Sequence, residues 1–144
     1  ALFSSLIPFT ICYIILFPLF SLDAGNLLQL LPIYILFSLA TLLMGMLMAA
    51  LFRQEVLTIE LIVALGSVGF TLTGFTWPRE MYPAALRYLV GLYPLTWMYE
   101  ESLKIWYRTG YRVNPLPLLG LIVLFAVPLS FLVHNRRNKL AQEN

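Results

Sequence analysis

Four long apolar stretches, separated by short polar intervals, dominate the pattern of hydrophobic and polar positions along the chain. Three of them carry no charged residue, and the other carries a single glutamate. At about 1.5 Å per residue, a helix of roughly 20 apolar residues crosses the hydrocarbon core of a bilayer. The pattern therefore predicts four transmembrane helices, at about residues 1–22, 27–52, 56–76 and 114–133.

The interval between the third and fourth spans, residues 77–112, follows a different pattern. It holds all three Trp and six of the eight Tyr of the chain but none of the ten Phe. Trp and Tyr have an apolar body and a polar tip, so they collect where hydrocarbon meets water. Prolines divide the interval into two short amphipathic helices, one over 84–93 and one that begins near Thr96. On the second helix, Glu100 and Lys104 are spaced for an i,i+4 ion pair. We predict a short re-entrant or interfacial helical hairpin.

The composition agrees with an integral membrane protein. Hydrophobic residues make up 60% of the 144 and charged residues 11%, whereas soluble domains have about 25% charged residues. The mean hydropathy is +0.84. We therefore expect an all-α, polytopic integral membrane fold. The net charge of +2 is too small to indicate nucleic-acid binding, and the lone Cys12 excludes an internal disulfide.

The positive-inside rule orients the chain through its C-terminal tail. Four spans place both ends and the Arg53 turn on one side, which then holds four basic residues against five on the other. The count alone does not decide the orientation. We weigh the dense basic tail, residues 134–144, more heavily than charges dispersed over a structured hairpin. The C-terminus is therefore predicted to be cytoplasmic and the hairpin to face outward.

The third span carries small residues at helical spacing and one acid. Its small face allows close helix packing or the lining of a pathway, and we favour packing. This face consists of Gly66, Gly69, Phe70, Thr73 and Gly74. Glu60 is a candidate proton or cation site, but the favoured interpretation is an interfacial carboxylate near Arg53, since a charge at mid-bilayer costs about 2.5–3.5 kcal/mol or more.

Several chemistries have no matching motif in the sequence. No Gly-x-x-x-x-Gly-Lys-Ser/Thr occurs, so the chain cannot hydrolyse ATP through a P-loop. The only histidine, His134, lies beside basic residues in the tail and favours a cationic surface role over a general base. No cluster has metal-ligand spacing, and no acid, base and nucleophile converge. This pattern favours transport or scaffolding over catalysis, with no cofactor bound by the chain.

Two segments resemble a known family. Leu-Thr-Gly-Phe-Thr-Trp-Pro-Arg-Glu-Met-Tyr-Pro-Ala-Ala-Leu at 72–86 and Leu-Tyr-Pro-Leu-Thr at 92–96 resemble the C-terminal half of type-2 ATP-binding-cassette (ABC) exporter permeases. Members of that family tend to carry a Gly-Phe near the outer end of the fifth helix. A proline, a Met-Pro-like pair and a Pro-Leu-Thr that opens the next helix then follow. Together with the order of spans and hairpin, the resemblance covers nearly the whole chain.

The resemblance implies that the four spans are the third to sixth of six and that 77–112 is the family's outward re-entrant hairpin. The first two spans, the exterior insertion and the coupling helix are then expected before Ala1. Arg53 and Glu55 are weak candidates for contact with the ATPase. Arg79 and Glu80 are interpreted as hairpin anchors. The hairpin or gate candidates are Gly74, Pro78, Arg79, Glu80, Pro83, Pro94 and Thr96.

By the same resemblance, the chain is expected to be the permease subunit of an ATP-driven exporter in the bacterial inner membrane. Its partners would be an ABC-type ATPase that binds ATP and Mg²⁺, a second permease copy, membrane lipids and, in some systems, a periplasmic adaptor. Two alternatives remain. One is a membrane-embedded lipid-modifying transferase that uses Glu60, or Glu80 with Arg79. The other is a non-catalytic scaffold subunit. Nothing in the sequence selects a transported substrate.

Overall fold

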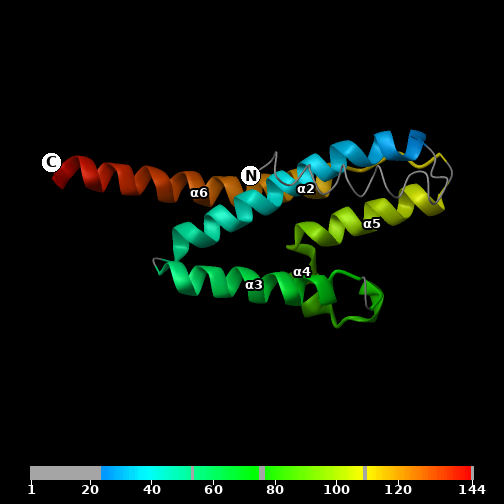
Figure 1. Cartoon of the computed structure of the whole chain (residues 1–144), viewed down its shortest axis with the longest axis horizontal. Helices are drawn as coiled ribbons and strands as arrows, with labels where there is room; N and C mark the ends of the chain where they lie inside the picture. Colours follow the sequence, from blue (N-terminus) through cyan, green and yellow to red (C-terminus); the bar gives the residue numbers. More distant parts are fainter. Residues whose placement is uncertain (1–23, 53, 75–76, 109, 144) are drawn as a thin grey trace.

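The computed structural model of the chain describes residues 24–52, 54–74, 77–108 and 110–143 (Figure 1). Within these residues the secondary structure is entirely helical, which confirms the predicted all-α class. The predicted first span, residues 1–22, lies outside the described residues. The elements are α2 (Ala24–Leu51), α3 (Glu55–Leu72), the 3-10 turn η1 (Arg79–Met81), α4 (Ala84–Gly91), α5 (Pro94–Tyr107) and α6 (Leu116–Glu143).

Three helices in the described part of the chain are long and apolar enough to cross a membrane. Their candidate spans are Leu28–Leu51 in α2, Glu55–Leu72 in α3 and Leu116–Asn135 in α6. They correspond to the spans predicted at 27–52, 56–76 and 114–133.

The end of α3 differs from the predicted end of the third span. The helix ends four residues before the predicted boundary at residue 76, since Thr73 forms the last helical hydrogen bond, from its N–H to the Gly69 carbonyl. Gly74 then adopts a φ of +95°, which glycine tolerates far better than other residues. The chain therefore turns out of α3 at the Thr73–Gly74 step.

The end of α6 also differs from the prediction. The segment 134–144, predicted as a tail, continues the helix as far as Glu143. The polar residues that follow the apolar part of α6 include neither Gly nor Pro, so nothing in this segment breaks the helix.

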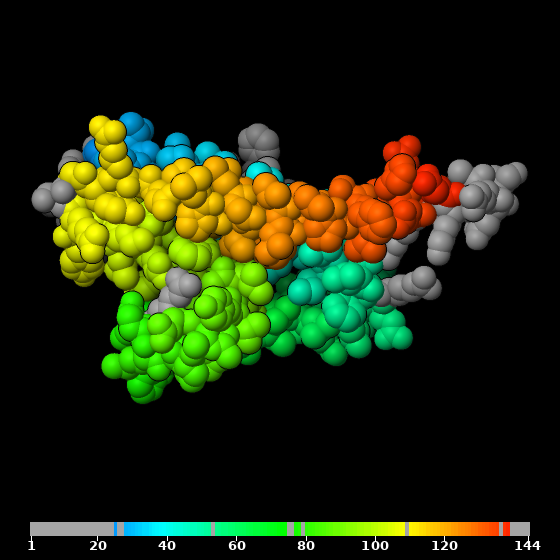
Figure 2. All heavy atoms as spheres, turned by 180° about the vertical axis from the view of Figure 1, so that it is seen from behind, coloured from blue at the N-terminus to red at the C-terminus, as the bar shows by residue number. Residues whose placement is uncertain are grey.

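The helices form two layers (Figure 1). α2 and α6 make the most extensive helix–helix contact, and α5 lies along the N-terminal part of α2. α3 and α4 form the second layer. Figure 2 shows α6 as a long ridge that runs from the hairpin past α3. The buried apolar residues are Ile33, Ala40, Val90, Ile105, Leu118, Leu121 and Phe125.

Among the residues whose burial the structure describes, this core is small, and many large apolar side chains of the three long helices are exposed. The buried positions of α6, Leu118, Leu121 and Phe125, recur at the i, i+3, i+7 spacing of one helix face. The other faces of these helices are suited to contact with lipid or with another membrane chain.

The hairpin contains the two predicted short helices, α4 and α5. Pro94 is the first residue of α5, a position where its missing N–H costs no hydrogen bond. The two arms differ in their surroundings. α5 contacts α2, α3 and α6, and several of its side chains are buried. α4 packs mainly on α5, and its buried residue is Val90. The arm that enters the bundle is therefore α5.

Candidate functional site

The small face predicted on the third span is divided between two environments. Gly69 is buried against the Tyr93 ring: a Cβ added at Gly69 would lie 2.7 Å from Tyr93 Cδ1 and closer still to Cε1. Thr73 is also buried, and its hydroxyl donates to the Phe70 carbonyl at 3.1 Å. Phe70 and Gly66 are exposed. The structure therefore brings Gly69, Thr73 and Gly74 toward the hairpin but leaves Gly66 and Phe70 exposed.

The elbow between α4 and α5 is held by side chains from the first turn of α5. The last carbonyls of a helix have no partner within the helix. Here the Thr96 hydroxyl donates to the Val90 carbonyl at 2.8 Å, and Trp97 Nε1–H donates to the Gly91 carbonyl at 2.8 Å. Thr96 and Pro94 are fully buried. Thr96 and Pro94, both predicted as hairpin residues, thus help to fix the angle between α4 and α5.

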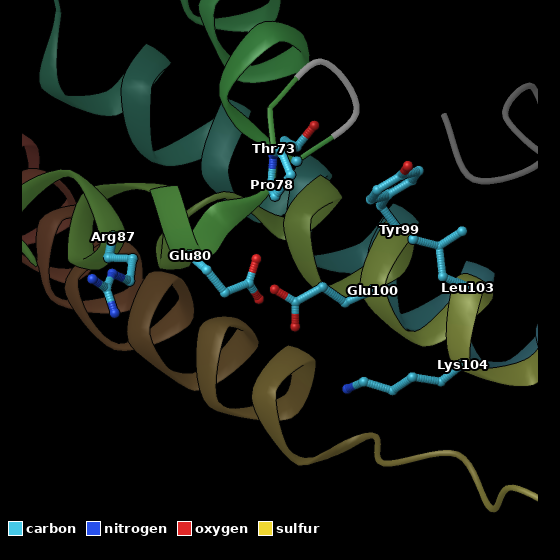
Figure 3. A pocket seen from close by; sticks show the side chains of 9 residues that line it. Thr73, Pro78, Glu80, Arg87, Tyr99, Glu100, Leu103 and Lys104 are labelled. Atoms are coloured by element: carbon cyan, nitrogen blue, oxygen red, sulfur yellow. The ribbon is translucent and has the colours of Figure 1, made fainter. Parts of the chain in front are cut away.

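A cleft of about 590 Å³ lies between the end of α3, η1, α4 and α5. Small-molecule sites are of roughly this size, about 300–1,000 Å³. Figure 3 shows Glu80 and Glu100, from η1 and α5, pointing toward one another in this cleft. The residues that line it are Thr73, Gly74, Pro78, Glu80, Arg87, Tyr99, Glu100, Leu103 and Lys104.

The cleft therefore brings together four of the predicted hairpin and packing residues, Thr73, Gly74, Pro78 and Glu80, and adds charged residues of both signs from α4 and α5. On α4, Arg87 Nε–H donates to the Tyr82 carbonyl at 3.2 Å, so part of the guanidinium is held by the turn before α4.

A buried carboxylate, Glu101, lies behind the cleft and is a site that the sequence reasoning missed. The side chain is 1% exposed. Its Oε1 accepts a hydrogen bond from Lys104 Nζ at 2.7 Å. Its Oε2 accepts from the Tyr111 hydroxyl at 2.9 Å and from the Asn114 N–H at 2.9 Å. This set of donors is the kind that stabilises a buried carboxylate in its charged form.

The pKa values follow from these contacts. Burial raises the pKa of Glu101, but the hydrogen bonds from Lys104, Asn114 and Tyr111 outweigh it, so the pKa is lowered overall. Burial lowers the pKa of Lys104, but its hydrogen bond to Glu101 and the Glu101 charge outweigh it, so the pKa is raised. Both groups are therefore charged at neutral pH.

The structure shows an ion pair on α5 between Glu101 and Lys104, at i,i+3, which the sequence analysis did not predict. Glu100 lines the cleft, and its charge contributes a smaller increase to the pKa of Lys104. The sequence signal that could have identified Glu101 is its own i,i+3 spacing to Lys104, with Tyr111 and Asn114 following at the end of the hairpin.

Two of the remaining predicted residues, Glu60 and Glu55, lie on α3 and do not line the cleft. Glu60 is exposed on α3. Glu55 is exposed in the first turn of α3, where the positive end of the helix dipole stabilises a negatively charged carboxylate. Arg53 lies outside the described residues. Pro83 is exposed at the start of α4, and Arg79 belongs to η1. Among the described residues, no group of three or more His, Cys, Asp or Glu is arranged to hold a metal ion.

Comparison with known proteins gives one match. The family model described as ABC-2 type transporter matches residues 1–107, which include α2, α3, both hairpin helices and the cleft. No curated protein and no solved structure matches the chain.

Proposed function

The chain belongs to the ABC-2 type transporter family, and from this premise we propose that it is the membrane-spanning permease subunit of an ATP-driven exporter. The match over residues 1–107 is the observation that carries the proposal. As an ABC-2 membrane domain, the chain is a transporter permease, and the family implies an ABC-type ATPase as its partner. The ATPase would bind ATP with Mg²⁺ and drive the permease between two conformations.

The exposed surface of α3 supports pairing with a second permease copy. Val56, Ile59 and Val63 are each more than 60% exposed and recur at the i, i+3, i+7 spacing of one face. Gly66 and Phe70 continue the exposed surface toward the hairpin. A second copy would cover this face, and the pathway would lie between the two bundles. The outward ends of both bundles would then border the exit.

The arrangement of the hairpin supports a gate at that exit. α5 is packed into the bundle, whereas η1 and α4 remain at its edge and border the cleft. Met81 and Tyr88, in η1 and α4, are 70% and 80% exposed. Short amphipathic elements of this kind rest at the membrane interface, where they move at less cost than a spanning helix does. We assign the outer gate to the hairpin, in which η1 and α4 are the parts that border the exit.

Labelling with a membrane-impermeant maleimide tests the orientation and the gate together. In a Cys12→Ser background, cysteine at Tyr88 should react from outside intact cells, and cysteine at Arg137 only after permeabilisation. In proteoliposomes with the partner ATPase, labelling at Tyr88 should differ between the nucleotide-free and vanadate-trapped states. Labelling at Leu28, which is exposed on α2, is the control and should not differ. Reaction of the Tyr88 cysteine only from the cytosol would overturn the exporter orientation.

The hairpin prolines offer a second test of the gate. Pro83→Ala and Pro94→Ala, alone and together, should reduce the nucleotide-dependent change in Tyr88 labelling while the complex still assembles. Pro32→Ala, at an exposed position of α2, is the matched control. An unchanged response in a folded, assembled double variant contradicts the gate. A scaffold predicts no effect of nucleotide on any position, and a lipid-modifying enzyme predicts turnover by the purified chain without ATP.

A further inference from the structure

Glu101 is the one charged side chain that is buried among the residues whose burial the structure describes. Burying a carboxylate is unfavourable unless it is paired and hydrogen-bonded, and removing one partner of such a pair is strongly destabilising. Glu101 meets that condition through three donors of different kinds: an ammonium, a phenol and a backbone amide. Two of the three come from outside α5, so the carboxylate links α5 to another part of the chain.

The part of the chain that Glu101 holds is the segment between α5 and α6. Tyr111 and Asn114 lie ten and thirteen residues after Glu101 and bring this connector back against α5. The Asn114 side chain accepts the N–H of Leu116, the first residue of α6, at 3.2 Å. Asn114 therefore binds Glu101 through its backbone and the start of α6 through its side chain. Lys104 Nζ also lies 5.9 Å from the centre of the Tyr111 ring, within cation–π range.

The joint between α3 and the hairpin includes a glycine turn and an exposed polar contact. Gly74 leaves α3 with a φ of +95°. Among the described residues, one polar contact across this joint runs from the Tyr82 hydroxyl to the Thr71 carbonyl; it is exposed and 3.4 Å long, near the upper limit for a hydrogen bond. The elbow between α4 and α5, in contrast, is held by the buried Thr96 hydroxyl.

We propose that Glu101 is a positioning residue that fastens the hairpin to α6, so that α4, α5 and the N-terminus of α6 move as one unit about the end of α3. The fastening stands on the contacts alone, and only the cause of the movement rests on the proposed permease function. By this proposal, opening of the outer gate displaces α6 together with the hairpin, and the angle between α5 and α6 stays constant while the position of α3 relative to both changes.

Distances between pairs of spin labels test the proposal in the full chain with its ATPase, in nanodiscs and a Cys12→Ser background. The first pair joins Tyr107 on α5 to Leu119 on α6, and the second joins Tyr107 to Val68 on α3; all three positions are exposed. We call the contacts of Glu101 with Lys104, Tyr111 and Asn114 the Glu101 clasp. With this clasp unaltered, we expect a single narrow distance distribution for the first pair in both the nucleotide-free and the vanadate-trapped states. The second pair should shift between these states.

Substitutions at the clasp supply the contrast. Glu101→Gln removes the negative charge and places an amide N–H₂ donor beside the donors of Lys104, Tyr111 and Asn114. The distance distribution of the first pair should therefore lose its single narrow peak. Tyr111→Phe removes one hydroxyl, should broaden the peak less, and keeps the test open if Glu101→Gln does not fold. Ser102→Ala is the matched control, one residue from Glu101 on α5, because the Ser102 hydroxyl donates to the Met98 carbonyl of the same helix; it should leave the peak unchanged.

Three results separate the proposals. A peak that stays narrow in folded Glu101→Gln overturns the fastening. A first pair that shifts with nucleotide in the parent chain overturns movement as one unit. If nucleotide moves neither pair while Glu101→Gln still broadens the first, the fastening stands and the proposed ATP-driven function fails.

Discussion

Gly69→Ala tests how closely α3 packs against the hairpin. The perturbation adds one methyl group on the buried side of α3, where a Cβ would lie 2.7 Å from Tyr93 Cδ1 and closer to Cε1. The ring is large and half-buried at the start of α5, so it must shift to admit the methyl group. Gly66→Ala is the matched comparison, one turn earlier on the same helix, where an added Cβ meets nothing within 4 Å.

The two substitutions share one energy term and differ in another. Replacing Gly by Ala inside a helix stabilises it by about 1 kcal/mol, and both variants gain this. Overpacking a filled site costs about 1–3 kcal/mol, and only Gly69→Ala incurs this cost. We therefore expect Gly66→Ala to be as stable as the parent chain or more stable, by up to about 1 kcal/mol. Gly69→Ala should be less stable than Gly66→Ala by about 1–3 kcal/mol.

Equilibrium unfolding with a denaturing detergent, followed by circular dichroism, measures this difference. A third substitution, Tyr93→Leu, removes the ring, and in that background Gly69→Ala should no longer be penalised relative to Gly66→Ala. Equal stability of the two alanine variants in the parent chain would refute the close contact. A penalty that persists without the Tyr93 ring would show that it has another cause.

The remaining predictions concern buried polar contacts of the hairpin. Thr96→Val removes the hydroxyl that donates to the Val90 carbonyl, which still accepts the Tyr93 N–H, and should lower the free energy of unfolding by about 0.5–1.5 kcal/mol. Thr41→Val, where the lost hydroxyl bond is exposed, should cost less in the same assay, and equal losses would contradict the assigned role. Because the pKa of Glu101 is lowered in the folded chain, its stabilisation is complete above the ordinary carboxyl pKa and is lost as the pH falls through the lower, folded value. Unfolding of Glu101→Gln should therefore depend less on pH in the acidic range than that of the parent chain, and identical slopes would argue against the clasp.

The three long helices and the two hairpin helices could be predicted because each depends on local sequence. Apolar runs of sufficient length specify spanning helices, and Pro83 and Pro94 divide the hairpin where the structure divides it. The boundaries that differed depend on finer properties. α3 ends at the Thr73–Gly74 turn instead of continuing to residue 76, and α6 continues through polar residues because helix formation does not require an apolar environment.

The Glu101 clasp could not be predicted with the same reliability. Glu100 and Glu101 are chemically identical and adjacent, and both lie within helical reach of Lys104. Glu101 is distinguished by its contacts with Tyr111 and Asn114, which reach α5 only after the connector has turned back. Such a contact depends on the path of the chain in three dimensions. The division of the small face on α3 has a similar origin, because the Tyr93 ring covers Gly69 but does not reach Gly66.

The length of α6 has a mechanical consequence. Its 28 residues extend over about 42 Å, of which the membrane-compatible segment, Leu116–Asn135, accounts for about 30 Å. With Leu116–Asn135 in the bilayer core, the rest of the helix would extend about 12 Å beyond it. A tilt of about 10° around its Leu116 end would displace Glu143 by about 7 Å. A molecule bound at that far end would sense a rearrangement of the hairpin without touching it.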